Sequence, residues 1–178
     1  MQGSLVRLRP VTREDLPRYV EWIADPEVRR HLNFYRPLSL EDEEHWFERL
    51  RGDGGQEVFA IETLEGRHIG GIGLHGIHTR YRLAEAGIFI GAKECWGRGY
   101  GTDAMRLLLA FAFDQLNLHR VFLNVHSDNL RALRSYEKCG FVLEGTLRQA
   151  AYKDGRYWDV HVMAVLKDEF ERIGGEVR

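Results

Sequence analysis

Three glycines at alternate positions mark the stretch Trp96-Gly97-Arg98-Gly99-Tyr100-Gly101, which an apolar, helix-like run follows. A helix start offers unpaired N–H groups and the positive end of the helix dipole, so an anion binds well there. Glycine has no Cβ and lets phosphate oxygens approach the main chain closely. We expect Thr102 to cap the helix and Arg98 to add a charge-assisted contact. The stretch therefore predicts either a phosphate-binding loop or a glycine-rich turn without a ligand.

The spacing of these glycines excludes two common phosphate-binding motifs. A Walker A loop needs Lys and then Ser or Thr after its last glycine, whereas Thr102-Asp103 follows here. A dinucleotide-binding fingerprint needs G-x-G-x-x-G in a parallel βαβ unit. The spacing here is G-x-G-x-G, and the strands expected before it form a meander. The kind of anion that binds here has to be inferred from another part of the chain.

A second stretch with chemical potential begins at His126 and ends at Phe141. It follows an expected strand and places Asn129 in a loop. The helix expected next carries Ser135 and Tyr136 near its end. A tyrosine hydroxyl can serve as a general acid when it lies beside a reacting group.

The sequence predicts no metal site. Cys95 and Cys139 are the only cysteines and lie far from any metal-ligand spacing, so we expect two reduced thiols in a cytoplasmic protein. The pair His75-x-x-His78 comes closest to a ligand motif, and we interpret it as part of an edge strand or loop.

Composition and charge limit the class of protein. The chain has 178 residues, 44% of them hydrophobic and 29% charged, which is enough for one domain with a core. A net charge of -2 gives no basic surface for nucleic acid. No apolar run approaches the roughly 20 residues of a membrane span. The start, MQGSLVRLRP, lacks the apolar segment of a signal peptide, so a cytoplasmic location is expected.

The hydrophobic periodicity predicts the elements that hold these residues. Strands are expected at Leu5–Arg9, Glu57–Thr63, His68–His75, Arg82–Ile90, Arg120–Val125, Phe141–Tyr152 and Tyr157–Leu166. Helices are expected after the caps Thr12 and Ser39, and over Ala104–Leu116 and Leu130–Lys138. The order predicts a mixed α/β domain around one sheet.

The glycine loop and the later helix together resemble the two motifs of the GNAT acyltransferases, which move an acetyl group from acetyl-CoA to an amine. The family's pyrophosphate loop, Q/R-x-x-G-x-G/A, is matched at residues 96–101, except that Trp96 stands where Gln or Arg is usual. The later family motif is an Asn followed by a helix that ends in Y-E-K-x-G-F. It is matched by Asn129 and by Tyr136–Phe141. The expected order of elements resembles that of the family along nearly the whole chain.

This resemblance implies a single GNAT domain over residues 1–178, with a mostly antiparallel central sheet and about four flanking helices. The sheet would splay between Ile88–Gly91 and Arg120–Val125, and acetyl-CoA would pair with the exposed main chain there. The residues implied to bind it are Phe89, Ile90, Gly91, Trp96, Gly97, Arg98, Gly99, Tyr100, Gly101, Thr102, Asn129 and Tyr136. Asp103 then has to point away from the phosphates. The resemblance also implies a homodimer, and the reaction it implies needs no metal.

Direct transfer requires a neutral amine, a donor to the oxyanion and an acid for the thiolate. A backbone N–H of the splayed strand is the expected oxyanion donor. Tyr136 matches the usual acid of the family. On reference pKa values, the transfer from a phenol to a thiolate is uphill by roughly 2 kcal/mol. The alternative is that Tyr136 only packs on the pantetheine arm.

Glu85 is the expected general base. It lies on the strand that leads to the splay, and alternation places Glu85, Gly87 and Phe89 on one face. A carboxylate there can take a proton from the amine directly or through water. Two alternatives remain: a surface salt bridge of Glu85 with a nearby arginine, or a histidine base. The residues concerned are Arg80, Arg82, His75 and His78.

Within the superfamily, the chain most resembles the ribosomal-protein-alanine N-acetyltransferases, with the spermidine N-acetyltransferases close by. The first resemblance rests on Leu5–Pro10, Leu143–Gln149, Asp154–Tyr157 and Asp159, and the second on Ile77–Glu85 and Leu116–Leu118. An α-amino group, with a pKa near ~8, is easier to deprotonate than a polyamine terminus near ~10.4. We therefore expect a protein or peptide N-terminus as acceptor, with a small-molecule or polyamine acceptor as the alternative. A catalytically silent CoA-binding module is the third possibility.

The two N-terminal helices and the closing hairpin are expected to form the substrate mouth. Its candidate residues are His31, Asn33, Phe34, Tyr35, Tyr152 and Trp158. Carboxylates would be needed for a polyamine, and Glu41-Asp42-Glu43-Glu44 offers four. Their positions span different faces of a helix. We interpret the run as a solvated first turn that complements the helix dipole.

Overall fold

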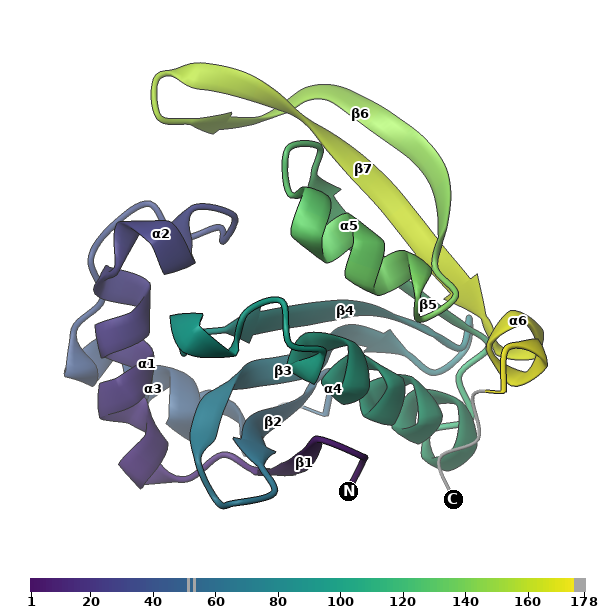
Figure 1. Cartoon of the computed structure of the whole chain (residues 1–178), viewed down its shortest axis with the longest axis horizontal. Helices are drawn as coiled ribbons and strands as arrows, with labels where there is room; N and C mark the ends of the chain where they lie inside the picture. The colour runs from purple at the N-terminus through teal and green to yellow at the C-terminus, as the bar shows by residue number, and fades with distance from the viewer. Residues whose placement is uncertain (51, 53, 175–178) are drawn as a thin grey trace.

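The computed structural model describes residues 1–50, 52 and 54–174. The expected domain spans 1–178, so residues 51, 53 and 175–178 of it lie outside the described part. Within that part, the strands form one seven-stranded sheet in the order β1-β2-β3-β4-β5-β7-β6 (Figure 1). Their bounds are Val6–Pro10, Glu57–Thr63, His68–His78, Leu83–Ile90, Arg120–His126, Val142–Lys153 and Arg156–Leu166 for β1 to β7. The expected mixed α/β fold is confirmed.

Six α-helices accompany the sheet over the described residues. They are α1 Leu16–Ala24, α2 Pro26–Arg29, α3 Leu40–Leu50, α4 Tyr100–Ala110, α5 Leu130–Glu137 and α6 Lys167–Arg172. The sequence did not predict α2 and α6, because helices of four and six residues are too short to show a hydrophobic period. The cap expected at Thr102 is wrong: α4 starts at Tyr100 after Gly99, and Thr102 lies inside its first turn.

Helices α1 and α4 cover opposite faces of the sheet. Successive side chains of β4 point to alternate faces. The Phe89 ring contacts Tyr19 and Trp22 of α1. Ile88 and Ile90 instead face the start of α4, and a Cβ at Gly101 would lie 3.9 and 3.8 Å from their side chains. The end of β4 therefore presents Phe89 to α1 on one face of the sheet, and Ile88 and Ile90 to α4 on the other.

The sheet splays between β4 and β5, as expected. The two strands are parallel and pair only over Leu83–Glu85 and Arg120–Phe122. From there β5 continues to pair with β7 as far as His126. On its β5 side, the segment Ala86–Ile90 has no partner among the described strands. The main-chain groups on this side of the segment are therefore available for a ligand, except the Ile90 carbonyl, which accepts from the Trp96 indole N–H.

Alternation identifies which main-chain groups face the splay. The carbonyl of Arg82 accepts from His119 and Arg120 on the β5 side. The N–H of Gly91 donates to Ile69 on the opposite, β3 side. Even-numbered residues of β4 therefore direct their N–H and C=O groups toward the splay. At the splay those residues are Ala86, Ile88 and Ile90, whereas Phe89 and Gly91, which were expected to pair with the ligand, face β3.

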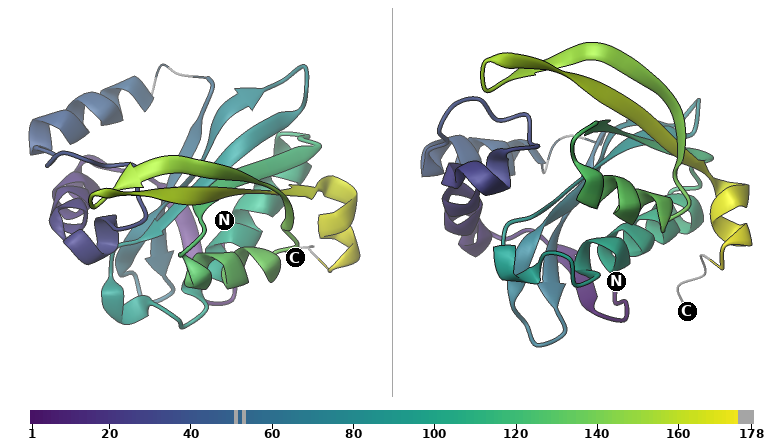
Figure 2. Two further views of the ribbon diagram at one scale, coloured as in Figure 1. Left: turned by 90° about the horizontal axis from the view of Figure 1, so that it is seen from above. Right: turned by 45° about the horizontal axis from the view of Figure 1, so that its top comes forward.

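The β6–β7 hairpin arches over α5 and reaches α2 with its tip (Figures 1 and 2). The Lys153 ammonium, at the tip, donates to the carbonyls of Arg29 and Leu32 at 2.6 and 2.9 Å. These bonds join the hairpin to the end of α2 and to the loop after it. That loop carries four of the expected substrate residues, His31, Asn33, Phe34 and Tyr35.

A cluster of charges fixes the start of α1 on the sheet. The Arg9 guanidinium donates to both carboxylate oxygens of Asp15 at 2.7 Å and to Glu62 at 2.6 Å. His68 Nδ1 lies 3.1 Å from Asp15, whose side chain is 6% exposed. Burial alone would raise the pKa of Asp15, but the bonds from Arg9 and the Thr12 N–H hold it below its ordinary value.

Asp15→Asn is therefore expected to lower the free energy of unfolding at pH 7 by about 3 kcal/mol, because the partly buried Arg9 guanidinium loses its two charge-assisted bonds to this carboxylate. A carboxyl with a lowered folded pKa stabilises the protein at neutral pH, and this contribution is lost as the pH falls through that pKa. Urea unfolding at pH 7 and pH 3 measures both effects. Asp114→Asn, at an exposed position, is the matched control. Equal effects of the two substitutions would contradict the role given to Asp15.

Candidate active site

The glycine loop uses its three glycines in two ways. Gly97 and Gly99 have φ angles of 71° and 89°, in the left-handed region that favours glycine. Gly101 lies in the first turn of α4 and faces a cavity. A side chain there would project into the cavity beside Ile88 and Ile90. Two glycines thus shape the turn, and the third keeps the surface clear where N–H groups begin α4.

Asp103 points away from this surface, as the sequence required. Its carboxylate accepts from the main-chain N–H groups of Ser4, Leu5 and Val6 at 3.3, 2.8 and 3.0 Å. The negative charge in the first turn of α4 is therefore used to hold the N-terminal segment. The carboxylate therefore does not point at an anion bound to the glycine loop.

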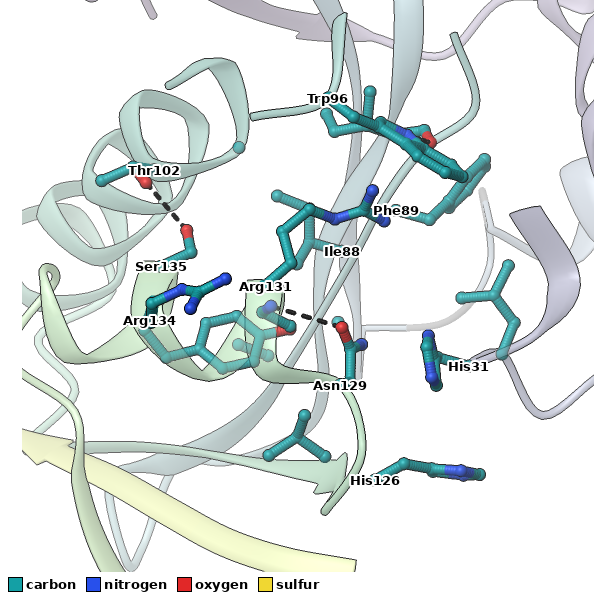
Figure 3. A pocket seen from close by; sticks show the side chains of 18 of the residues that line it. His31, Ile88, Phe89, Trp96, Thr102, His126, Asn129, Arg131, Arg134 and Ser135 are labelled. Atoms are coloured by element: carbon teal, nitrogen blue, oxygen red, sulfur yellow. Dashed lines mark hydrogen bonds between the residues drawn. The ribbon is translucent and has the colours of Figure 1, made fainter. Parts of the chain in front are cut away.

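A cation from α5 lies over the tryptophan that replaces the family's Gln or Arg. The Trp96 indole N–H donates to the carbonyl of Ile90 at 2.7 Å. The guanidinium of Arg131 lies 3.8 Å from the centre of the Trp96 ring (Figure 3). A guanidinium over an aromatic face is held by cation–π attraction and keeps its donors for a ligand. Trp96 thus forms a support for a charge that comes from a distant part of the chain.

Two further cations of α5 face the same cavity. Arg134 and Lys138 line it with Arg131, and the spacing of three and then four residues places all of them on one face of α5. The sequence analysis missed this set, although that spacing was a visible signal. A bond of 2.8 Å between the hydroxyls of Thr102 and Ser135 joins α4 to α5 (Figure 3).

The cavity has a volume of about 630 Å³ and runs from the glycine loop along the splay. Most residues expected to bind acetyl-CoA line it: Phe89, Ile90, Trp96, Gly97, Gly99, Tyr100, Gly101, Thr102, Asn129 and Tyr136. Gly91 and Arg98 do not line it. A Cβ at Gly91 would lie 2.0 Å from the ring of Trp22, so this glycine serves the packing of α1. The Arg98 guanidinium lies near the ring of Tyr100, 5.7 Å from its centre.

Asn129 and Tyr136 approach the splay from the two ends of α5. The side-chain oxygen of Asn129 caps α5 by accepting from the Ala132 N–H at 3.3 Å, which leaves the side-chain amide N–H groups for a ligand (Figure 3). Burial raises the pKa of Tyr136 to about 12. The phenol is therefore protonated throughout the physiological pH range.

Glu85 and His75 lie opposite each other on β4 and β3. The carboxylate of Glu85 accepts from the Asn124 amide at 2.8 Å, across the base of the splay. The salt bridge considered for Glu85 does not form: Arg82 instead donates twice to Asn117 at 2.6 Å. His75 Nδ1 lies 3.4 Å from the side-chain oxygen of Gln56.

His75, the second candidate base, lies close to Glu85 in the same cavity. Its Nε2 lies beside Gly87, 3.4 Å from where a Cβ would stand. Burial lowers the pKa of His75, although the nearby charge of Glu85 opposes the shift. Both side chains line the first cavity, so the geometry keeps both as candidates.

A second cavity, of about 540 Å³, lies on the face of the sheet that α1 and α3 cover. Tyr19, Trp46, Phe34 and Glu43 are among the residues that line it. The two cavities meet at the end of β4, because they share Leu32, Asn33, His75, Gly87, Ile88 and Phe89. The open N–H of Ile88 is therefore accessible from a cavity on either side.

The expected substrate residues divide into two groups. His31 lines the first cavity, Phe34 the second, and Asn33 both. The other three line neither cavity; they are Tyr35, Tyr152 and Trp158. Tyr35 is 93% exposed, and Tyr152 packs on Tyr157 near the hairpin tip. Trp158 lies under the guanidinium of Arg156. The hairpin aromatics thus pair locally.

Among the described residues, no group of three or more His, Cys, Asp and Glu side chains could hold a metal ion. In the same part of the chain, no helix is long and apolar enough to span a membrane.

Arg131→Met is expected to weaken the binding of CoA about tenfold or more, because a charge-assisted bond to phosphate contributes about 1.5–3 kcal/mol. Its affinity for pantetheine, which lacks the pyrophosphate, should stay within about twofold. Isothermal titration with both ligands measures the difference. Arg148→Met, at an exposed position of β6, is the control. An equal loss for both ligands would show that Arg131 only supports the loop.

Comparison with known proteins gives consistent matches. A model of the acetyltransferase (GNAT) domain matches residues 6–142. Spermidine N(1)-acetyltransferase of Vibrio cholerae is 32% identical over 169 residues, which cover 94% of this chain and 96% of that protein. The ribosomal N-acetyltransferase YdaF of Bacillus subtilis is 30% identical over 165 residues, or 93% and 87% of the two chains. The crystal structure of the Vibrio cholerae spermidine enzyme with CoA and spermine superposes with a TM-score of 0.87 at 30% identity, over 93% of this chain and 98% of that one.

Proposed function

The chain belongs to the GNAT acetyltransferase family, and we propose that its acceptor is an aliphatic polyamine of the spermidine class. It is an N-acetyltransferase that uses acetyl-CoA as donor. The sequence had favoured a protein N-terminus, whereas the spermidine N-acetyltransferases compared above favour the polyamine. The second cavity is the observation that carries the proposal, because its volume suits a small molecule and it opens on the reacting strand.

The donor would bind along the first cavity. Its pyrophosphate would accept from N–H groups of residues 97–102 and from Arg131 and Arg134, which line the same space. Its pantetheine arm would pair with the open edge of β4 at Ile88 and Ile90, as an added strand does. The Asn129 amide would donate to the arm. These residues fit the donor because the edge, the helix start and the cations lie in one continuous cavity.

The chemistry would take place where the two cavities meet. The neutral amine attacks the thioester carbon, and the oxyanion accepts from the Ile88 N–H. When the intermediate collapses, the C–S bond breaks and Tyr136 donates its proton to the thiolate. The proton of the amine goes to Glu85, directly or through water. The products are the N-acetylated amine and CoA.

A polyamine requires a base more than a peptide N-terminus does. Its terminal amine has a pKa near ~10.4, so the neutral form costs roughly 4 kcal/mol at pH 7.5. The Glu85 carboxylate, held by Asn124, and the neutral His75 beside it offer two acceptors for that proton. The site thus contains the groups that this more demanding substrate needs.

A thiol-release assay with acetyl-CoA tests the acceptor class. We expect release with spermidine and spermine, and a product heavier by one acetyl group in mass spectrometry. An N-terminal alanyl peptide and an aminoglycoside complete the panel. Release with the peptide alone would contradict the polyamine proposal. Binding of CoA without release for any amine would indicate a silent module.

A further inference from the structure

Glu43 differs from its acidic neighbours on α3 because it is buried. Its residue exposure is 7%, whereas Glu41 and Glu44 are exposed. Asp42 lies in the first turn of α3, where its carboxylate accepts from the N–H and hydroxyl of the preceding Ser39 and pairs with Arg36. The sequence predicts that all four acidic residues are solvated. This prediction is wrong for Glu43, whose side chain lines the second cavity.

The Glu43 carboxylate has no hydrogen-bond or ion-pair partner among the described residues. Burial raises its pKa to about 7, and the adjacent charge of Asp42 adds to the shift. The Tyr19 hydroxyl, from α1, is also buried and unpartnered within that part of the chain. A buried polar group is normally satisfied, so the unpartnered Tyr19 hydroxyl and the unpaired Glu43 carboxylate that lines the same cavity point to a ligand that supplies donors.

The walls around these two groups suit a cation with an apolar chain. The rings of Tyr19 and Trp46 lie edge to face with centres 6.0 Å apart, and Phe34 and Phe89 complete an aromatic lining. Aromatic faces attract ammonium groups and also accommodate methylenes. Among the cationic residues of this cavity, Arg36 is paired with Asp42, and His45 and Arg49 are exposed. Glu43 is thus the buried charge of the lining.

We propose that Glu43 is a specificity-determining residue that binds a second, distal ammonium of the acceptor. The amine that reacts lies at Ile88, where the cavities meet, and the chain extends through the aromatic lining to Glu43. The Tyr19 hydroxyl accepts from the same distal ammonium. The proposal rests on the proposed function and sharpens it: the preferred acceptors are linear amines with two cationic nitrogens and an apolar spacer between them.

Glu43→Gln is the informative variant, because glutamine keeps the size of the side chain and removes its charge. We expect kcat/KM for spermidine and for α,ω-diamines to fall about 10- to 100-fold, as the loss of a charged hydrogen bond predicts. Monoamines of the same chain length should change by less than about threefold, since they have no distal charge. Glu44→Gln makes the same charge change outside the cavity and should leave both series unchanged. Circular dichroism confirms the folding of each variant.

The result that overturns this role is a wild-type preference for diamines that Glu43→Gln leaves intact, or an equal loss for diamines and monoamines. Calorimetric titration of spermidine into each protein gives a second readout that does not depend on turnover. Failure of the proposed function looks different. In that case the wild type acetylates neither polyamines nor diamines, before any variant is compared.

Discussion

Tyr136→Phe is expected to lower kcat for acetyl transfer about 100- to 1,000-fold, while the affinity for acetyl-CoA stays within about threefold. The phenol lies in the donor cavity with its pKa raised to about 12. Transfer of its proton to a thiolate with a pKa near ~8.5 is then uphill by about 5 kcal/mol. The proton therefore has to move as the C–S bond breaks. The phenylalanine ring keeps its place, but it has no proton to donate to the leaving thiolate.

Stopped-flow turnover and calorimetric binding of acetyl-CoA separate the two roles considered for Tyr136. Tyr157→Phe, at a residue 63% exposed on the hairpin, is the control. The raised pKa of Tyr136 also predicts that the wild-type rate shows no loss from phenol ionisation below about pH 10. Unchanged kcat would exclude the acid role. A parallel loss of acetyl-CoA affinity would favour simple packing on the pantetheine arm.

Glu85→Gln is expected to lower kcat/KM for spermidine about 100-fold at pH 7.5 and less at higher pH. Without the base, only amine that is already neutral reacts. Its fraction rises about tenfold per pH unit up to a pKa near ~10.4, so the variant should approach the wild type near pH 10. The Asn124 contact at 2.8 Å is retained in part, because the glutamine oxygen also accepts. A pH profile of both proteins measures the effect.

His75→Gln is the matched comparison for this experiment. His75 lines both cavities and is kept neutral by burial, so it is the rival base. If His75→Gln produces the steep profile and Glu85→Gln does not, the proton goes to the histidine. If neither variant changes the profile, both side chains are excluded as the base.

The strands and the donor loop could be predicted because their signals are local. The β-branched and aromatic residues between turn signals predicted the strand Glu57–Thr63 with its observed bounds. The glycines mark the turn before α4 because Gly97 and Gly99 need positive φ angles, which few other residues adopt. Asp103 could be expected to turn away, since an anion site and a carboxylate repel each other.

The rest depends on packing between segments that are distant in sequence. Arg131 lies over Trp96 only because α5 packs beside the glycine loop. Glu43 is buried because α3 covers a cavity together with α1, and no local pattern separates it from Glu44. The hairpin aromatic Tyr152 was a candidate for the substrate wall, but its ring packs on Tyr157 within the hairpin itself. The acceptor side of the site therefore could not be predicted from the sequence.

A crystal structure with a bisubstrate analogue, in which an acetyl bridge joins the terminal nitrogen of spermidine to the sulfur of CoA, tests the central claim most directly. We predict that the pyrophosphate lies on the N–H groups of residues 97–102 and that the bridging carbonyl accepts from the Ile88 N–H. The polyamine should then extend past Gly87 into the second cavity, with its distal nitrogen at Glu43. A pyrophosphate away from the glycine loop, or a polyamine that leaves the site beside His126, would contradict the account.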